Sequence, residues 1–217
     1  MKEPKKDYLP AAGKDWMLPF YDPFTWLSGS RAIHKKLIHQ SAIEAGFQVL
    51  EIGCGTGSLI IQAKRMFPGA DFMGIDPDPN ALAIASRKAQ KNNLPLQFDQ
   101  GYSEDLPYPN ASFDRVLSAF MLHHLQPDAK QLAIQEAYRV LKPGGSLHIA
   151  DFEETHEHGH GGGIHDLLLR RMHGHHQVSP QRMILATMQD ADFEESREVA
   201  RQSSIMGRVI FYEALRS

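Results

Sequence analysis

The sequence predicts one α/β domain built on a doubly wound, Rossmann-like sheet of seven strands, mostly parallel with an antiparallel last strand. Two segments lead to this prediction. Residues 49–57, VLEIGCGTG, place a short apolar run directly before three alternating glycines. Residues 71–76, DFMGID, form a second apolar run that ends on a carboxylate. A strand, a glycine loop and a helix in this order form the nucleotide-binding corner of such a sheet.

The remaining segments justify the fold element by element. Residues 30–45 predict a helix, because Ile33, Leu37, Ile38 and Ala42 recur on one face. The other expected elements are a helix at 58–66, strands at 96–100 and 113–120, a helix end, Pro-Gly-Gly turn and fifth strand within 141–149, a helix at 180–190, and strands at 193–203 and 207–215. The last two strands suit the antiparallel pair that closes a seven-stranded sheet.

Length and composition fit a single domain of 217 residues. We expect a disordered leader at 1–15 and one domain at 16–217, with an N-terminal aromatic and helical cap and a histidine-rich insertion at 153–177. A net charge of −3 offers no overall basic field for nucleic acid, and no apolar run is long enough to cross a bilayer. Cys54 is the only cysteine, so no intrachain disulfide can form and a cytoplasmic protein is expected.

The glycine spacing separates two classes of nucleotide site. A dinucleotide loop reads G-x-G-x-x-G and would need its third glycine where this chain has Ser58. Here Gly53, Gly55 and Gly57 alternate as G-x-G-x-G, and Glu51 precedes the first of them by two residues. An acidic loop attracts a ligand with a free ammonium group. An NAD-type oxidoreductase is therefore disfavoured, and S-adenosylmethionine, which has an ammonium and no pyrophosphate, is favoured.

Five motifs in order extend this argument over residues 48–152: VLEIGCGTG, GID, SEDLP, FDRVLSAFMLHHL and LKPGG. With them the chain resembles the class I, seven-strand S-adenosylmethionine-dependent methyltransferases. Within that family it is most similar to the small-molecule branch that includes ubiquinone and menaquinone C-methyltransferases and phospholipid N-methyltransferases. The resemblance implies that S-adenosylmethionine is the cofactor and that the protein is a methyltransferase.

The resemblance also implies roles for individual residues. Glu51 and Gly53 are expected at the methionine end of the cofactor, and Ser103 and Glu104 at the rim of the adenine. Asp76 is expected at the ribose, where a carboxylate at a strand end can accept both hydroxyl groups. The full expected cofactor site consists of Tyr21, Glu51, Gly53, Cys54, Gly55, Gly57, Asp76, Pro77, Ser103, Glu104 and Phe120.

Some of these positions carry a second interpretation. Tyr102 stands where relatives often have an acidic residue, so adenine recognition is expected to rest on backbone groups, on Ser103 or on Glu104. Tyr21, one of five aromatic residues between 16 and 26, is expected either to cap the cofactor or to pack in the core. Pro77 is flat and apolar enough to lie near the adenine. Cys54 is expected to be a small loop residue rather than a nucleophile.

Histidines supply the remaining candidates. His123 and His124 follow the fourth predicted strand and are the candidates for a general base, the alternative being that they shape the cofactor pocket. Seven of the twelve histidines fall between His156 and His176. Such a density of imidazoles can bind a divalent transition metal. Because no cysteine accompanies these histidines and the glycines at 159 and 161–163 make the segment flexible, we expect a mobile polar lid over the substrate site instead, and no metal ligand set.

The predicted reaction is direct in-line displacement of a methyl group onto a small, partly apolar organic acceptor. The single cysteine argues against arsenite methylation, and the chain lacks the Pro-Cys motif of cytosine C5 methylation and the Asn/Asp-Pro-Pro-aromatic turn of exocyclic amino methylation. The acceptor atom and the oligomeric state stay open. The alternative functions are a non-catalytic S-adenosylmethionine or S-adenosylhomocysteine-binding module and, less favoured, an NAD-type oxidoreductase. We expect no nucleic-acid partner and no integral membrane segment.

Overall fold

The computed structural model describes residues 30–153, 180–205 and 207–217. Within these ranges seven strands form one sheet in the order β3-β2-β1-β4-β5-β7-β6. Neighbouring strands pair in parallel from β3 to β5, and β7 runs antiparallel to both β5 and β6. The predicted doubly wound, mostly parallel sheet with an antiparallel last strand is therefore confirmed.

The elements agree with the sequence pattern along most of the chain. The strands are β1 (Gln48–Ile52), β2 (Asp71–Asp76), β3 (Gln97–Gln100), β4 (Phe113–Ala119), β5 (Leu141–Phe152), β6 (Glu195–Ser204) and β7 (Gly207–Leu215). The helices are α2 (Ser30–Gln40), α3 (Ser58–Met66), α4 (Pro79–Lys91), α5 (Pro127–Val140) and α7 (Pro180–Asp190), with a 3-10 turn, η2 (Leu122–His124). Of the described helices, none has the length and apolar character needed to span a bilayer.

Several predicted boundaries were wrong by one to five residues, and two of these differences have a clear local reason. The helix expected over 30–45 ends at Gln40. The Ser41 hydroxyl donates back to the Ile38 carbonyl, and Ala42, at a φ of 44°, has left the helical conformation. The strand expected from residue 193 begins at Glu195. Phe193 lies instead in the turn that follows α7, where its N–H donates to the Met188 carbonyl at 3.2 Å.

The prediction of a helix end, a turn and then a strand within 141–149 was wrong, because β5 begins at Leu141, ends at Phe152 and contains the Pro-Gly-Gly residues as an irregularity in its pairing with β4. Phe113 pairs with Leu141, whereas Arg115, only two residues later, pairs with Ser146. The four residues 142–145 therefore have no counterpart on β4. Gly144, at a φ of 78°, takes the left-handed conformation that this detour requires.

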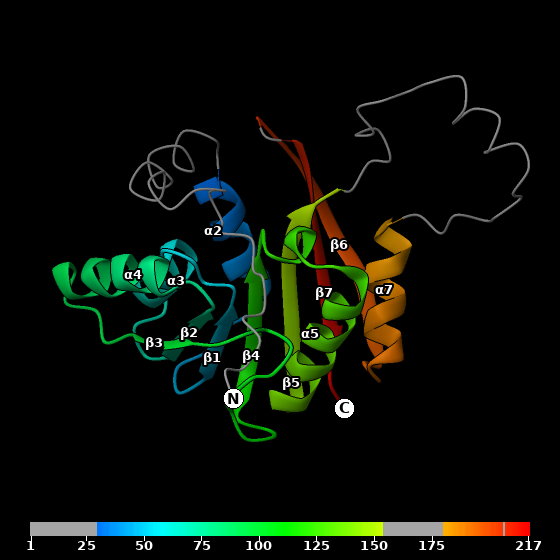
Figure 1. Cartoon of the computed structure of the whole chain (residues 1–217), viewed down its shortest axis with the longest axis horizontal. Coiled ribbons are helices and arrows are strands. Elements are labelled where there is room, and N and C mark those ends of the chain that lie inside the picture. Colours follow the sequence, from blue (N-terminus) through cyan, green and yellow to red (C-terminus); the bar gives the residue numbers. More distant parts are fainter. Residues whose placement is uncertain (1–29, 154–179, 206) are drawn as a thin grey trace, which may run out of the picture.

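Two groups of helices cover the sheet. α2, α3 and α4 lie together on one side of the molecule, and α5 and α7 lie on the other (Figure 1). Ile33 and Leu59 belong to the apolar core beneath α2 and α3, whereas Ile134 and Met188 belong to the core beneath α5 and α7. The sheet is thus buried on both faces, as its long apolar runs predict.

The position of a site follows from the strand order. From β1 the chain winds outward through β2 to β3, and from β4 it winds the other way to β5. The carboxyl ends of β1 and β4 therefore flank the topological switch point, where doubly wound sheets leave a crevice for ligands. The glycine loop follows β1, Asp76 ends β2 and Phe120 follows β4, so the predicted site residues converge on this crevice.

Candidate functional site

A cavity of about 490 Å³ opens at the carboxyl ends of these strands. This volume lies within the roughly 300–1,000 Å³ typical of small-molecule sites. The predicted site residues in its wall are Glu51, Gly53, Cys54, Gly55, Asp76, Pro77, Ser103, Glu104, Phe120 and His124. The sequence analysis therefore identified most of one continuous surface from four separate segments of the chain.

Other predicted residues lie elsewhere. Gly57 does not line the cavity but directly precedes α3, with a φ of 74°. A Cβ at this position would stand 3.0 Å from the Cβ of Ala85 in α4, so the absence of a side chain allows α3 and α4 to pack together. His123 also lies outside the cavity wall. Tyr21, the leader at 1–15 and all but the first residue of the insertion at 153–177 fall outside the described residues.

The glycine loop is fastened to the end of β2. The N–H groups of Gly53 and Cys54 donate to the Ile75 carbonyl at 2.9 and 3.0 Å. Gly53, at a φ of 72°, has no room for a side chain, because a Cβ would stand 2.4 Å from the Cγ of Met121. Gly55, at a φ of 50°, has open space within 4 Å of the Cβ position and lines the cavity. The first glycine is thus required for packing, and the second leaves room for a ligand.

Asp76 joins the loop to the next helix. Its Oδ2 accepts the Gly55 N–H at 2.8 Å and its Oδ1 accepts the Asp78 N–H at 3.0 Å. Burial raises the pKa of Asp76, and the Asp78 charge adds to that, whereas the two N–H donors act in the opposite direction. A carboxylate has about four lone-pair sites, so acceptor capacity is left for a ligand.

Glu51 takes the place of a helix cap. Gly57, the residue before α3, has no side chain with which to cap the helix, and the Glu51 Oε2 accepts the Ile60 N–H in the first turn at 3.0 Å. Burial raises the pKa of Glu51 well above its ordinary value, and the charge of Asp76 raises it further. A buried carboxyl that lines the cavity beside a helix N-terminus is suited to a cationic ligand group, which would favour its charged form.

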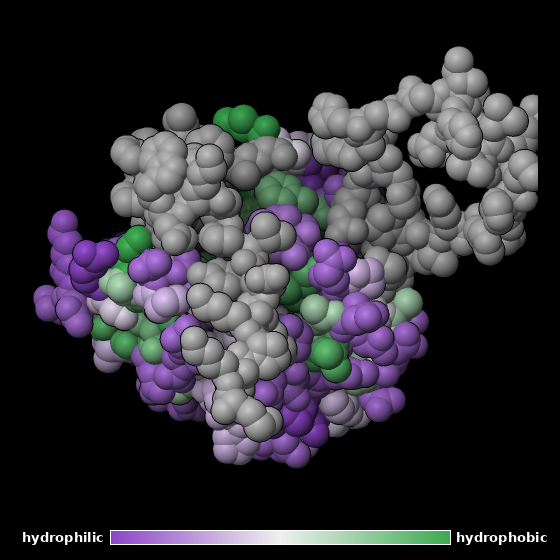
Figure 2. Space-filling view, viewed as in Figure 1, coloured by the Kyte–Doolittle hydropathy of each residue, from purple (hydrophilic) through white to green (hydrophobic). Residues whose placement is uncertain are grey.

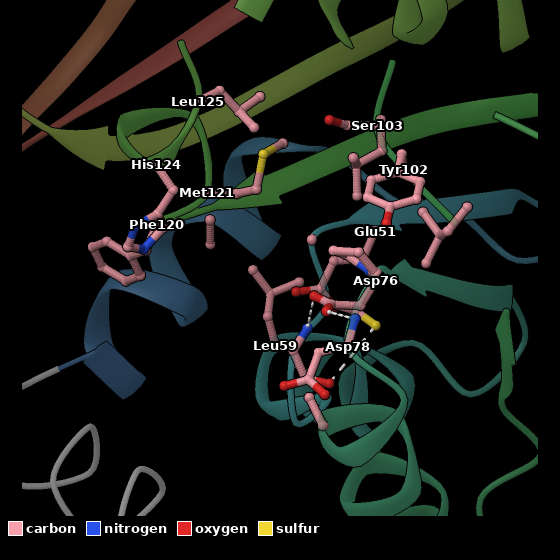
Figure 3. A pocket seen from close by; sticks show the side chains of 18 of the residues that line it. Glu51, Leu59, Asp76, Asp78, Tyr102, Ser103, Phe120, Met121, His124 and Leu125 are labelled. Carbon is pink, nitrogen blue, oxygen red and sulfur yellow. Dashed lines mark hydrogen bonds between the residues drawn. The ribbon is translucent and has the colours of Figure 1, made fainter. Parts of the chain in front are cut away.

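Asp78 is a cavity residue that the sequence analysis missed. It caps α4 by accepting the Asn80 N–H at 2.8 Å through Oδ1, while its buried Oδ2 has no hydrogen-bond partner among the described residues. The side chains of Glu51, Asp76 and Asp78 gather at one end of the cavity (Figure 3). The signal was available, because an Asp directly before a Pro-initiated helix is a frequent N-cap.

The polar turn after β3 forms another wall. Tyr102 and Asp105 pair as an isolated bridge, and the Asp105 N–H donates to the Tyr102 carbonyl at 3.3 Å. The turn places Ser103 and Glu104 on the cavity, with the Ser103 hydroxyl donating to Glu104 Oε2 at 2.9 Å. Tyr102 itself lines the cavity, where the family resemblance suggested an acidic side chain.

Aromatic and imidazole groups form the side of the cavity opposite this turn. Figure 3 shows Phe120 and His124 there, with Met121 nearer the centre. Phe120 has a φ of 56°, a conformation that is uncommon for a bulky residue and is found most often at functional sites. Its ring centroid lies 6.0 Å from that of His34, a buried residue of α2 that also lines the cavity.

Both imidazoles in this wall are held neutral. Burial, aided by the charge of Lys88, lowers the pKa of His34 to about 4. Burial also lowers the pKa of His124, and neighbouring His123 adds to that effect. At neutral pH these side chains therefore present uncharged rings, and a neutral imidazole has a lone pair that can accept a proton.

His123 is held by Asp151 at the end of β5. The Asp151 Oδ1 lies 2.6 Å from His123 Nδ1, and its Oδ2 accepts the His123 N–H at 3.2 Å. Asp151 also accepts the Phe152 N–H at 2.8 Å, so its buried carboxylate is well satisfied. The rings of His123 and His124 lie 4.0 Å apart between centroids. Asp151 therefore fixes the short turn that presents His124 to the cavity.

Neither thiol chemistry nor a metal site is apparent among the described residues. Burial raises the pKa of the Cys54 thiol well above its ordinary value, which disfavours the thiolate and agrees with a small loop residue. Within the part of the chain that the structure describes, no group of three or more His, Cys, Asp or Glu side chains is arranged to hold a metal ion. The histidine-rich segment lies outside that part.

Comparisons with known proteins agree with this geometry. Residues 49–145 match a family model described as a methyltransferase domain. Over 105 residues the chain is 39% identical to a demethylmenaquinone methyltransferase of Thermus thermophilus, an alignment that covers 48% of this chain and 47% of the relative. The chain thus aligns with about half the length of this relative.

Solved structures support the fold. A SAM-dependent methyltransferase from Aquifex aeolicus is similar with a TM-score of 0.62 and 19% identity, over 85% of this chain and 89% of that one. Phosphoethanolamine N-methyltransferase 2 of Haemonchus contortus, solved with S-adenosyl-L-methionine, has a TM-score of 0.72 and 17% identity, over 95% and 58% of the two chains. The match, the topology and the cavity confirm the predicted class I methyltransferase fold.

Proposed function

We propose that this chain is a class I S-adenosylmethionine-dependent methyltransferase that transfers a methyl group to a small, partly apolar organic acceptor. One observation carries the proposal. The cavity at the switch point has carboxyl groups at one end and a neutral aromatic and imidazole wall at another side. The first suits a ligand with a cationic amino acid end, and the second suits an uncharged acceptor.

The residues present fit S-adenosylmethionine on two counts. Gly55 leaves open space where a Cβ would stand, and Asp78 keeps a buried carboxylate oxygen without a partner. We assign Glu51 and Gly53 to the methionine end and the remaining acceptor sites of Asp76 to the ribose hydroxyls. Pro77, Ser103 and Glu104 border the adenine in this assignment. The family resemblance gives the same roles for all of these residues except Pro77.

Bound S-adenosylmethionine supplies an electrophilic methyl group on a sulfonium. The protein then has to align the acceptor and exclude water, and alignment alone can account for roughly 7–11 kcal/mol of a bimolecular barrier. Phe120, His34 and Met121 provide a largely uncharged wall for this purpose. Such a wall suits methyl transfer, because the positive charge of the sulfonium is lost in that step.

His124 is the residue we assign as general base for a carbon or hydroxyl acceptor. Its pKa is lowered by burial, so its free base form predominates at neutral pH. His123 and Asp151 hold the turn that carries it. A quinol-like ring is the first acceptor to test, because four of the relatives are named demethylmenaquinone methyltransferases.

Turnover and ligand identity test the proposal together. The purified full chain would be incubated with S-adenosylmethionine labelled in the methyl group and a panel of quinols, phospholipids and amines. Acceptor-dependent formation of S-adenosylhomocysteine and a labelled product would support methyl transfer. Tight cofactor binding with no transfer to any acceptor would favour a binding module. A nicotinamide nucleotide found by mass spectrometry of the purified protein would contradict both.

Cofactor affinity is expected to increase with pH because of Glu51. Its raised pKa means that the carboxyl is protonated at low pH and becomes charged as the pH rises through that value. Since the ammonium group of the ligand binds the charged carboxylate better, the affinity measured by calorimetry should keep rising with pH above the range in which an ordinary carboxyl titrates, with proton release on binding. The Glu51→Gln variant keeps an acceptor for Ile60 and should lose most of this dependence. An unchanged slope in that variant would assign the titration to another group, such as Asp76.

A further inference from the structure

The three helices on one side of the sheet have an unusual charge composition. These helices, α2, α3 and α4, contain no Asp or Glu within their bounds. Their Lys and Arg residues are Arg31, Lys35, Lys36, Lys64, Arg65, Arg87, Lys88 and Lys91. We call these three helices the basic layer. The net charge of −3 for the whole chain conceals this local excess of cations.

Most of these cations face solvent. Arg31, Lys35, Arg65, Arg87 and Lys91 are exposed. None of the five takes part in an ion pair with a described residue, whereas other cations of the described chain pair with carboxylates, as in Arg139–Glu136, Lys142–Asp114, Arg197–Glu213 and Arg208–Glu153. In the space-filling view, strongly hydrophilic residues cover the outer end of α4 (Figure 2).

The helices on the other side of the sheet are electrically balanced. α5 and α7 together contain three cations and three carboxylates, which are Lys130, Arg139, Arg182, Asp128, Glu136 and Asp190. Both sides bury comparable apolar cores, so packing does not explain the difference. The excess positive charge is therefore a property of one outer surface of the molecule.

The basic layer also borders the cavity. α2 contributes Ser30 and His34 to its wall, α3 contributes Ser58 and Leu59, and α4 contributes Ala81. Arg31 and Lys35 are the sequence neighbours of two of these residues and are exposed. A large anionic partner held on the basic layer would thus lie beside the cavity.

We infer that the basic layer docks on the surface of a lipid bilayer that contains anionic phospholipids. Cations spread over the outer surface of three helices suit an extended anionic plane, where each Lys or Arg contributes about a fivefold gain in affinity. A polynucleotide is less well matched, because the basic layer contains no Phe, Tyr or Trp on which bases could stack. The choice of a bilayer also rests on the proposed function, since a partly apolar acceptor partitions into lipid.

Vesicle co-sedimentation with the full chain tests this inference. At low salt the protein should bind vesicles of phosphatidylcholine with about one third phosphatidylglycerol and should not bind phosphatidylcholine alone. Because the Debye length falls from about 10 Å at 0.1 M salt to about 3 Å at 1 M, binding should be lost as salt rises. The double variant Arg87→Glu, Lys91→Glu should bind at least about 25-fold more weakly.

A matched control separates the effect of this surface on vesicle binding from the effect of the net charge of the protein. Arg197→Glu with Arg208→Glu changes the net charge equally on β6 and β7 and should retain vesicle binding. Circular dichroism and cofactor affinity should be unchanged in both double variants, which excludes unfolding as the cause. The inference would be overturned if both double variants lost vesicle binding equally, or if the protein bound neutral vesicles as well as anionic ones. Binding to a duplex oligonucleotide but not to vesicles would also overturn it. Failure of methyl transfer with vesicle binding intact would contradict the proposed function alone.

Discussion

Replacement of Gly55 by valine is expected to abolish S-adenosylmethionine binding while the fold persists. No heavy atom lies within 4 Å of the position that a Cβ would take, so the new side chain meets no packed neighbour and enters the cavity instead. The φ of 50° is also unfavourable for a β-branched residue, at a cost of roughly 1–2 kcal/mol. Calorimetric titration, with circular dichroism to check folding, measures the effect.

The chain offers a matched control for backbone strain. Gly144, in the irregular part of β5, has a φ of 78° and likewise no atom within 4 Å of its Cβ position, but it does not line the cavity. Gly144→Val should therefore lose a similar amount of stability and keep its cofactor affinity. Retained affinity in a folded Gly55→Val protein would mean that the glycine loop is only a turn.

Replacement of Asp76 by alanine is expected to weaken S-adenosylmethionine binding by about 1.5–3 kcal/mol, which is about ten- to hundredfold. Two causes add together. The ribose hydroxyls lose a charged acceptor in our assignment, and the N–H groups of Gly55 and Asp78 lose the carboxylate that orders the loop. Titration of the folded variant measures the sum.

A modified ligand separates the two causes. If Asp76 contacts the ribose, the wild-type protein should discriminate strongly between S-adenosylhomocysteine and its 2′-deoxy analogue, and the alanine variant should discriminate little. If Asp76 only orders the loop, both ligands should lose affinity equally. Equal discrimination in the two proteins would therefore refute the ribose assignment and leave the loop role standing.

Local sequence patterns were sufficient for the framework of the site. The run before Gly53 and the carboxylate at Asp76 each lie at the end of a buried strand, and parallel strands bring such ends to one edge of the sheet. The same argument placed Phe120 and His124 on the cavity. To place these residues, only the order of the strands is needed, and the order of the motifs along the chain indicates it.

Residues that depend on packing between distant segments were not predictable in the same way. His34 reaches the cavity because α2 packs against α3 and β5, and in the sequence it is one polar residue within an amphipathic helix. Asp151 stands 28 residues after His123, and no local pattern connects the two side chains. The roles of Tyr21 and of the histidine-rich insertion stay predictions, since both lie outside the described residues.

The fastening of the glycine loop has a consequence for the kinetics of ligand capture. The N–H groups of Gly53 and Cys54 donate to the end of β2 and that of Gly55 donates to Asp76, so the chain itself supplies the hydrogen bonds that order the loop. The entropy lost in ordering this loop is therefore lost when the chain folds, and it does not reduce the free energy of association. A ligand that arrives at this part of the cavity meets a surface already in its binding conformation. Its rate of association is then set by access to the cavity rather than by rearrangement of the loop.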